Sequence, residues 1–491
     1  MSQYWILVAI LLPILGSLLI PLLPFSHKQW MHLYIEILVL VTSAIVCGLV
    51  LEGTTDTFAV VHFVNELSIS FKIDGMTMVF AGLIAILWPL ATLYAFEYME
   101  HAKHVKAFFM FYVMTYGVTL GIAFAEDMVT MYFFYELLTL VTVPLVMHNL
   151  DRDSIHAVRK YLYFSIGGAA FALMGIIFII VYGNTCAFTL GGVLADSAIA
   201  EHAPLLLWIY FLSFMGFGVK SAIWPVSSWL PQAGVAPTPV TALLHAVAVV
   251  NAGAFAIIRL TYYSFGIEFL RGTWVQSACM ALSMFTIVYG CSRALKETHI
   301  KRRLAWSTVS NLSYIIFGAT IMTPWGLVGA LAHFVFHGFM KICSFLCAGA
   351  FMHQTGKTHV YHMDGLGKKM RIVFGCFTVS ALGLMGVPGL AGFVSKWNLT
   401  TAAVESGTPL AYVGIACLLV SALLTALYML NVVARAYFPK AGQPVEVPEG
   451  AKDPTWRMCI PLLLCAAAVI VLGVRSEPLI EFFRAVALGL E

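Results

Sequence analysis

Charged residues are scarce in this sequence. Asp, Glu, Lys and Arg make up 10% of the 491 residues, hydrophobic residues make up 61%, and the mean hydropathy is +0.91. In a soluble domain about a quarter of the residues are charged. The composition therefore excludes a soluble globular domain and predicts a polytopic membrane protein. A formal net charge of +3 is too small to indicate nucleic-acid binding.

Cysteine pairs of the kind that bind metals are also missing. The ten cysteines contain no C-x-x-C motif, and the nearest two, Cys343 and Cys347, are at helical spacing in an apolar segment. Cysteines in such a setting are usually small core residues. No iron–sulfur, haem or zinc pattern is visible, so we expect no metal and no cofactor in this chain. Any redox cofactor would belong to partner subunits.

A cleavable signal peptide is not predicted either. The first apolar segment, YWILVAILLPILGSLLIPLL, is long enough to span a membrane and lacks a small-residue cleavage site. Similar apolar stretches recur along the chain and predict an all-α protein with 14 transmembrane helices. These lie near residues 4–23, 31–52, 75–97, 108–124, 128–148, 160–182, 205–234, 237–262, 275–292, 304–321, 324–353, 371–398, 410–434 and 457–474.

The positive charges orient these helices. With the N-terminus outside, loops on one side carry Lys28, Lys103, Lys106, Arg152, Arg159, Lys160, Arg293, Lys296, Lys301, Arg302, Arg303, Lys357, Lys368, Lys369, Arg371, Arg435, Lys440, Lys452 and Arg457. The other side carries only Lys72, Arg259, Arg271, Arg475 and Arg484, with acidic residues such as Asp74, Glu126 and Asp127. Cytoplasmic loops are enriched in Lys and Arg. We therefore expect an integral protein of the inner (cytoplasmic) membrane of a prokaryote, with both termini on the outer side.

Two segments outside the spans carry weaker patterns. Residues 53–73 alternate in polarity over short stretches and predict paired strands on the outer side. Residues 435–457 predict a polar loop on the cytoplasmic side.

Four charges lie in the middle of long apolar segments, namely Glu136, Lys220, Lys341 and Lys396. Each costs roughly 2.5–3.5 kcal/mol on insertion scales and is usual only where charges pair, line water or carry ions. Glu136 near Lys220 would keep both groups charged and control proton transfer onto the lysine. The alternative for this pair is a static structural ion pair, and the alternative for Lys396 is snorkelling to the membrane interface.

Two stretches of the chain have similar length and the same number of predicted spans. Residues 108–262 and residues 275–437 each contain five helices. An odd number of spans makes the second unit enter from the opposite face, which predicts an inverted repeat. Residues 1–107 form an N-terminal three-helix segment, and residues 438–491 hold the last span and a short tail.

The fourth helix of each unit contains a proline. Pro225 follows Lys220 by five residues, and Pro388 precedes Lys396 by eight. Proline removes a backbone donor and clashes one turn back, so both helices should be broken beside a lysine. Such breaks are tolerated at membrane depth where they are packed in protein or face a wet cavity.

Histidines accompany the lysine of the eleventh span. His333, His337 and Lys341 are spaced i, i+4 and i+8 and therefore project from one helix face. Histidine titrates near neutral pH and can both accept and release a proton. Metal ligation by His333 and His337 is the alternative, but no third ligand lies nearby in the sequence. His245, on the eighth span, is either a relay residue or a satisfied core histidine.

Several segments closely resemble one known family. They are DGMT at 74–77, FYELLTL around Glu136, and the stretches KSAIWPVSSWLPQAGVAPTPVTALLHA at 220–246, HFVFHGFMKICSFLCAG at 333–349 and GVPGLAGFVSKW at 386–397. The family is that of the antiporter-like subunits shared by respiratory complex I, Mrp-type cation/proton antiporters and membrane-bound hydrogenases.

This resemblance implies a proton-translocating subunit of a larger assembly. The implied relay consists of Glu136, Lys220, His245, His333, His337, Lys341 and Lys396. The implied partners are other membrane subunits, related antiporter-like subunits among them, together with H⁺, Na⁺ as a further candidate ion, and the lipid bilayer. The chain itself would be part of a redox-driven translocase or of an antiporter, without a redox centre of its own.

The chain departs from the family pattern at one position. Several relatives carry a lysine on the eighth helix where this chain has Asn251, whose amide can hold a water but cannot titrate. We therefore expect His245 to carry the titrating step there.

Two other functions remain as alternatives, an autonomous transporter of a small solute or ion and a non-conducting membrane scaffold, although a scaffold has no need for four charges at bilayer depth.

Overall fold

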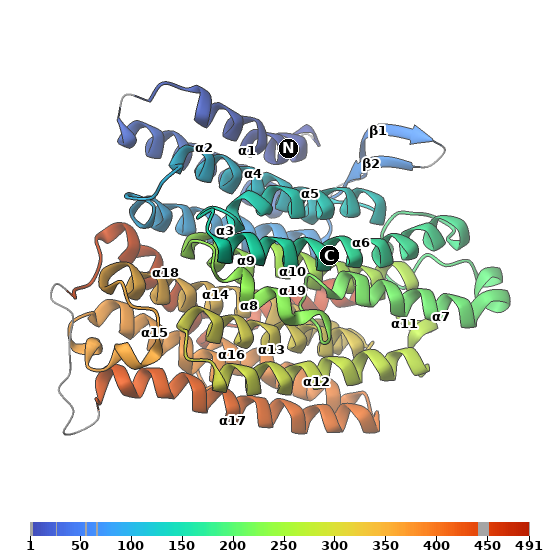
Figure 1. The fold of residues 1–491 in the computed structure, drawn as a ribbon. Helices are drawn as coiled ribbons and strands as arrows, with labels where there is room; N and C mark the ends of the chain where they lie inside the picture. The colour runs from blue at the N-terminus through green and yellow to red at the C-terminus, as the bar shows by residue number, and fades with distance from the viewer. Residues whose placement is uncertain (1–2, 26, 55, 65–66, 440–450, 491) are drawn as a thin grey trace.

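The computed structural model of the protein describes residues 3–25, 27–54, 56–64, 67–439 and 451–490. Most of these residues form helices that run side by side as one bundle (Figure 1). Twelve helical segments in the described ranges are long and apolar enough to cross a membrane. They are α1 (Tyr4–Leu22), α2 (Lys28–Glu52), α3 (Gly75–Tyr98), α4 (Val105–Phe124), α5 (Met128–Val146), α6 (Arg152–Tyr182), α7 (Asp196–Gly218), the segment Thr238–Phe265, α12 (Trp274–Lys296), α14 (Pro324–Thr355), α17 (Pro409–Tyr437) and α18 (Trp456–Val474). The chain is thus an integral, multi-pass membrane protein.

Helices also occupy the two remaining positions that the sequence predicts. One is α13 (Ile300–Thr320), and the other is divided into α15 (Arg371–Met385) and α16 (Ala391–Glu405). Nearly every side chain of α13 is buried, including a run of serine, threonine and asparagine residues. Because α13 lies inside the bundle, it needs no apolar outer surface, and its polar residues can serve an internal site.

Both predicted helix breaks are present. α7 ends at Gly218, and the chain then passes through irregular turns and a cis Trp224–Pro225 peptide before η1 (Val226–Trp229) and α8 (Leu230–Ala233). Between α15 and α16, Gly386 and Gly389 have φ values of 92° and 86°, which residues with a side chain rarely adopt. The proline and glycine residues therefore interrupt the helices where the sequence places them.

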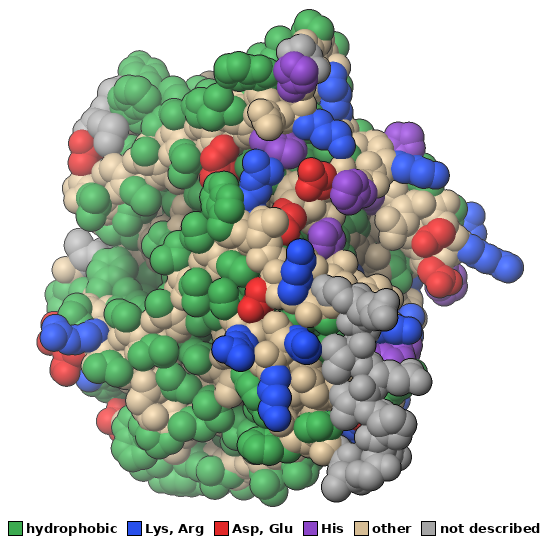
Figure 2. Space-filling view, turned by 90° about the vertical axis from the view of Figure 1, so that its left-hand side faces the viewer, with side chains coloured by type: hydrophobic (Ala, Val, Ile, Leu, Met, Phe, Trp, Pro, Cys, Tyr) green, Lys and Arg blue, Asp and Glu red, His purple; other side chains and the backbone are tan. Residues whose placement is uncertain are grey.

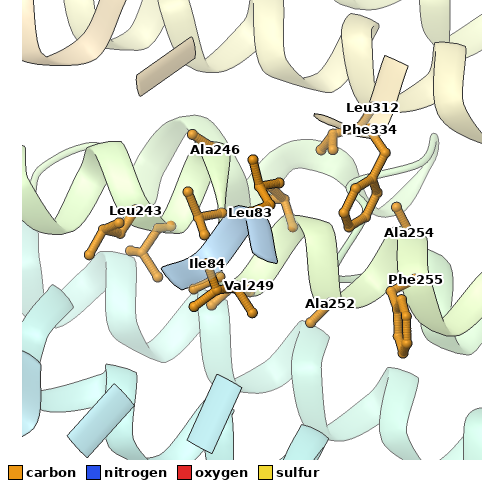
Figure 3. Packing of buried hydrophobic residues seen from close by; sticks show 14 of the residues in the cluster. Leu83, Ile84, Leu243, Ala246, Val249, Ala252, Ala254, Phe255, Leu312 and Phe334 are labelled. Carbon is orange, nitrogen blue, oxygen red and sulfur yellow. The ribbon is translucent and has the colours of Figure 1, made fainter. Parts of the chain in front are cut away.

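The eighth predicted helix is broken as well, which the sequence did not predict. The expected continuous helix 237–262 is divided into α9 (Thr238–Ala246), α10 (Val249–Ile258) and a π-helical segment, η2 (Arg259–Phe265). No proline or glycine lies at the break between α9 and α10. Figure 3 shows apolar side chains, among them Ala246 and Val249, packed on either side of it, so the surrounding helices support the distortion.

Short elements complete the fold. Strands β1 (Phe58–Val64) and β2 (Leu67–Phe71) form an antiparallel hairpin with Phe58 opposite Phe71, in agreement with the expectation for residues 53–73. The remaining elements are α11 (Ile267–Leu270), η3 (Val360–Met363), η4 (Leu366–Lys368) and α19 (Glu477–Leu488). The helix α19, which packs on α14, was not predicted. Residues 440–450 of the expected polar loop lie outside the described residues.

Lysine and arginine side chains gather at one end of the bundle, which Figure 2 shows; we call this end the cationic face.

Three cations assigned to loops by the sequence are in fact buried. Lys301 and Arg303 of α13 are 4% and 6% exposed. Arg259, assigned to the opposite side, is 1% exposed and forms a bidentate ion pair with Asp74. Its Nη1 and Nη2 donate hydrogen bonds of 2.6 and 2.7 Å to the two carboxylate oxygens.

Two carboxylates expected in outer loops are buried too. Glu126 is 8% exposed and Asp127 is 6% exposed. Asp127 begins α5 by accepting a 2.7 Å hydrogen bond from the Thr130 backbone N–H, and it accepts another of 2.6 Å from Ser70 on β2. It therefore fixes the start of the helix that carries Glu136 and ties it to the hairpin.

Candidate functional site

Glu136 on α5 and Lys220 at the break after α7 come together in the structure. Lys220 Nζ lies 3.8 Å from Glu136 Oε1, with Lys220 1% exposed and Glu136 27% exposed. The ammonium also donates a hydrogen bond to the Tyr135 carbonyl and lies 3.3 Å from the centre of the Tyr135 ring. One helix thus supplies every one of these partners of the buried cation, and a small movement of α5 relative to the break would alter them all.

The break itself positions Lys220. Trp229, beyond the break, donates a 2.8 Å hydrogen bond from Nε1 to the carbonyl of Val219. Gly253 of α10 packs directly on the broken segment, since a Cβ at that position would lie 2.6 Å from the Ser221 backbone nitrogen. The irregular turn is therefore held from two sides, and Lys220 points from it toward α5.

The break between α9 and α10 lies beside His245. Asn251 Nδ2 donates a 3.0 Å hydrogen bond back across the break to the carbonyl of Ala246. The His245 ring stacks on Phe345 of α14 with ring centres 4.8 Å apart, and neither of its buried nitrogens has a hydrogen-bond partner among the residues that the structure describes. Lys341 and Lys301 are the cations whose charges act on it.

His333, His337 and Lys341 share one face of α14 and are fully buried. The rings of His333 and His337 are stacked with centres 5.9 Å apart. Lys341 Nζ donates a 2.6 Å hydrogen bond to the Ser307 hydroxyl and one of 3.2 Å to the Leu304 carbonyl, both on α13. The helical spacing in the sequence therefore does bring these three groups onto one side, where Lys341 and His333 contact α13.

Lys396 lies at the second break and is half-buried. Its ammonium donates hydrogen bonds of 2.7 and 3.1 Å to the carbonyls of Leu384 and Met385, in the last turn of α15. These carbonyls are available because α15 ends there. The adjacent residue, Ser395, pairs with His333 Nδ1 at 2.9 Å, so the second break and α14 meet through this contact.

The assembled groups form a row of titratable side chains with gaps. The row runs from Glu136 and Lys220 past His245, Lys341, His337 and His333 to Lys396. Buried nitrogens of His245, His333 and His337 have no partner among the described residues. Unpartnered buried polar atoms are usually satisfied by water, and water can also carry protons between groups too far apart for direct transfer.

Three contributors were missed by sequence reasoning. Ser307 accepts hydrogen bonds from Lys341 and from the Tyr428 hydroxyl of α17, and Ser395 contacts His333. Serine and tyrosine are common in membrane helices, so only the polar run in α13 pointed to an internal role. Within the part of the chain that the structure describes, no group of three or more His, Cys, Asp or Glu residues is placed to hold a metal.

The comparisons with known proteins agree with this architecture. Residues 125–425 match the family model described as NADH:quinone oxidoreductase/Mrp antiporter, TM, and residues 63–109 match that of NADH-Ubiquinone oxidoreductase (complex I), chain 5 N-terminus. The chain therefore belongs to the NADH:quinone oxidoreductase/Mrp antiporter family of membrane subunits.

Two kinds of relatives stand out within that family. The chain is 30% identical to NADH-quinone oxidoreductase subunit N of Desulforudis audaxviator over 432 residues, covering 84% of this chain and 83% of that protein. It is 26% identical to Na(+)/H(+) antiporter subunit A1 of Staphylococcus haemolyticus, covering 95% of this chain but 60% of that protein. The chain thus spans less than two thirds of the antiporter relative.

Solved structures share the fold. The chain superposes on a chain of the Mrp complex from Dietzia sp. with a TM-score of 0.85 and 20% identity, covering 100% of this chain and 98% of the other. It superposes on a chain of respiratory complex I from Thermus thermophilus with a TM-score of 0.82 and 21% identity, covering 99% and 98%.

Proposed function

We propose that this chain is a proton-translocating membrane subunit of a larger assembly whose other members are membrane subunits, related antiporter-like ones among them. The observation that carries the proposal is the placement of three lysines, two buried and one half-buried, beside groups that can take or hold their charge. Lys220 and Lys396 lie at helix breaks, and Lys341 lies between them against α13. A redox reaction, in an assembly that performs one, would be carried out by other subunits.

The proposed mechanism begins at the Glu136–Lys220 pair. When the two groups are close, the carboxylate stabilises the ammonium and the lysine keeps its proton. When α5 moves away, the buried ammonium loses that stabilisation and releases its proton toward His245 through water. Lys341 and the two α14 histidines then pass a proton to Lys396, and each group returns to its starting state when a new proton arrives.

In this mechanism the helix breaks are the places where the backbone moves. Continuous helices would satisfy their own carbonyls, whereas Lys396 is held by carbonyls that only a break leaves free. Movement at a break changes the lysine's partners without displacing the whole helix. His245 lies at the third break, with Asn251 bonded across it, and takes the titrating step that Asn251 cannot.

The topology belongs to the same proposal. We infer 14 spans, with α13 and the α15–α16 pair added to the twelve apolar segments, and two inverted units at 108–262 and 275–437. The cationic face would be cytoplasmic in a prokaryotic inner membrane, with both termini outside. The antiporter relatives favour a second candidate, the exchange of Na⁺ for H⁺ along the same row.

The proposal is tested with the intact assembly in proteoliposomes. Proton movement is followed with a pH-sensitive dye, with a protonophore control, for the wild type and for the double variant Lys220→Ala/Lys396→Ala. We expect the double variant to assemble and to lose proton movement. Preserved movement in that variant would favour the scaffold. Solute-dependent currents from the purified chain alone would favour an autonomous transporter.

A further inference from the structure

Lys301 is a buried cation that the row described above does not use. It lies in the first turn of α13, near the cationic face, and is 4% exposed. Its neighbour Arg302 is exposed, so the chain does not bury the segment as a whole. A lysine buried in this way needs a compensating partner or a role in ion movement.

The partner is a single backbone oxygen. Lys301 Nζ donates a 2.6 Å hydrogen bond to the carbonyl of Ala236, in the connection between α8 and α9. The same carbonyl accepts a 3.0 Å hydrogen bond from the Thr241 hydroxyl of α9. Within the described ranges no carboxylate forms an ion pair with Lys301. A neutral oxygen stabilises an ammonium less than a carboxylate does, so this lysine can give up its proton more easily than a paired one.

Lys301 faces the central groups on its inner side. His245 lies one helical turn beyond Thr241 on α9, and the charge of Lys301 acts on it. On α13, Leu304 and Ser307, which hold Lys341, follow Lys301 by three and six residues. At 1.5 Å rise per residue, Ser307 is about 9 Å along the helix axis from Lys301. Lys301 is thus the next basic group on the way from Lys341 and His245 to the cationic face.

Three histidines lie together at the start of α13, where His299 is close to Lys301 in the chain. His299 is the residue before α13, and its ring lies 5.6 Å from that of His359, centre to centre. The His362 ring is 6.0 Å from His359 on the other side. All three are half-buried, and in the described part of the chain Nδ1 of His299 and of His362 has no hydrogen-bond partner. Burial, followed by the charge of Lys301, lowers the pKa of His299 to about 4, so its imidazole is neutral near pH 7.

We propose that His299, His359 and His362 form a proton-collecting cluster on the cationic face and that Lys301 passes protons between this cluster and His245 and Lys341. A neutral imidazole accepts a proton on one ring nitrogen and releases one from the other. The Lys301 ammonium gives its proton inward through water and regains one from the cluster, so no charge accumulates. This path deepens the proposed function, on which it rests, by naming where protons enter the central groups.

The competing role for Lys301 is structural, because its hydrogen bond also holds the α8–α9 connection to α13. The two roles separate in Lys301→Arg. Arginine can keep the charge and the donor but does not release its proton at physiological pH. In the intact assembly in proteoliposomes, we expect Lys301→Arg and Lys301→Met both to slow proton movement by about 10-fold or more. Lys296→Met, an exposed lysine of the same face, is the matched control and should be unaffected.

The cluster is tested by chemical rescue. His299→Ala should slow proton movement, and imidazole added on the cationic-face side should restore it, because free imidazole can replace a missing proton carrier but not a missing structural contact. His353→Ala, an exposed histidine near the same face whose ring packs against Tyr98, is the control and should change nothing. Wild-type movement in Lys301→Arg, or no rescue of a slowed His299→Ala, would overturn the inference while leaving the proposed function standing. An inactive wild-type assembly would instead overturn the proposed function.

Discussion

The Lys341 ammonium donates a 2.6 Å hydrogen bond to the Ser307 hydroxyl, and the Tyr428 hydroxyl donates one of 2.7 Å to the same oxygen. One serine therefore joins α14, α13 and α17 at the centre of the bundle. Besides Ser307, Lys341 has only the Leu304 carbonyl as a hydrogen-bond partner among the described residues. The position of the central lysine thus depends strongly on a hydroxyl that carries no charge.

Ser307→Ala should slow proton movement markedly without preventing assembly. A hydrogen bond to a charged group contributes about 1.5–3 kcal/mol, and about 1.4 kcal/mol corresponds to a tenfold change in rate. We therefore expect a loss of about 10-fold in dye-monitored proton movement. Ser313→Ala is the control, because Ser313 is buried on the same helix and, within the described ranges, bonds only to the Val309 carbonyl of its own helix. Equal rates for the two variants would contradict the assigned role of Ser307.

His245 and Asn251 should respond differently to truncation. His245→Ala removes the titrating group at the α9–α10 break and should block proton transfer between the first unit and α14. Asn251→Ala removes the hydrogen bond to Ala246 and should slow transfer only modestly. Proton movement in proteoliposomes, with assembly checked by size-exclusion chromatography, measures both.

The reverse change at Asn251 is a companion test. Asn251→Lys introduces the residue that relatives carry, and a wet site should tolerate it. Normal pumping by His245→Ala, or failure of Asn251→Lys to assemble, would contradict this view of the break.

The Asp74–Arg259 pair should matter for stability rather than for transfer. Arg259 is 1% exposed, and Asp74 also caps α3 through a 2.9 Å hydrogen bond from the Thr77 backbone N–H. Removing one partner of a buried pair costs about 3–5 kcal/mol because the other charge is left uncompensated. Arg259→Met should therefore lower the thermal unfolding temperature of the assembly.

A double variant tests whether Asp74 and Arg259 stabilise the protein as a pair or independently. Asp74→Asn/Arg259→Met should be less destabilised than the sum of the two single variants. Full additivity, measured by thermal unfolding in detergent, would show that the two residues act independently.

The sequence predicted most of the helix positions because long apolar runs in a chain this poor in charge are typical of membrane-spanning helices. It also predicted both breaks beside Lys220 and Lys396, since proline and glycine cannot continue a regular helix there. Glu136 and Lys220 were expected to meet, and they lie 3.8 Å apart.

What the sequence could not predict depends on contacts between distant segments. The α9–α10 break contains no breaker residue, and its stability comes from the bond between Asn251 and Ala246 and from packing against α14. Lys301 lies in the run HIKRR, which is typical of a cytoplasmic loop, yet it is buried and bonded to the α8–α9 connection. Glu36 of α2 was overlooked because it is a single charge in an otherwise apolar stretch. Its Oε2 atom is nevertheless buried in the structure.

The Glu136–Lys220 pair carries the central claim. Glu136→Gln and Lys220→Ala should each abolish proton movement while leaving assembly intact, because the first removes the charge that holds the proton and the second removes the carrier. A static ion pair would give the same result if its loss merely distorted the break, so these variants alone do not separate the two roles.

Lys220→Arg separates them most directly. Arginine keeps the positive charge beside Glu136 and can preserve the ion pair, but it does not release its proton at physiological pH. The measurement is the initial rate of proton movement by the intact assembly in proteoliposomes, at equal assembly levels. If Lys220 carries protons, Lys220→Arg is as inactive as Lys220→Ala; if Lys220→Arg moves protons at the wild-type rate, the pair is structural and the proposed relay is wrong.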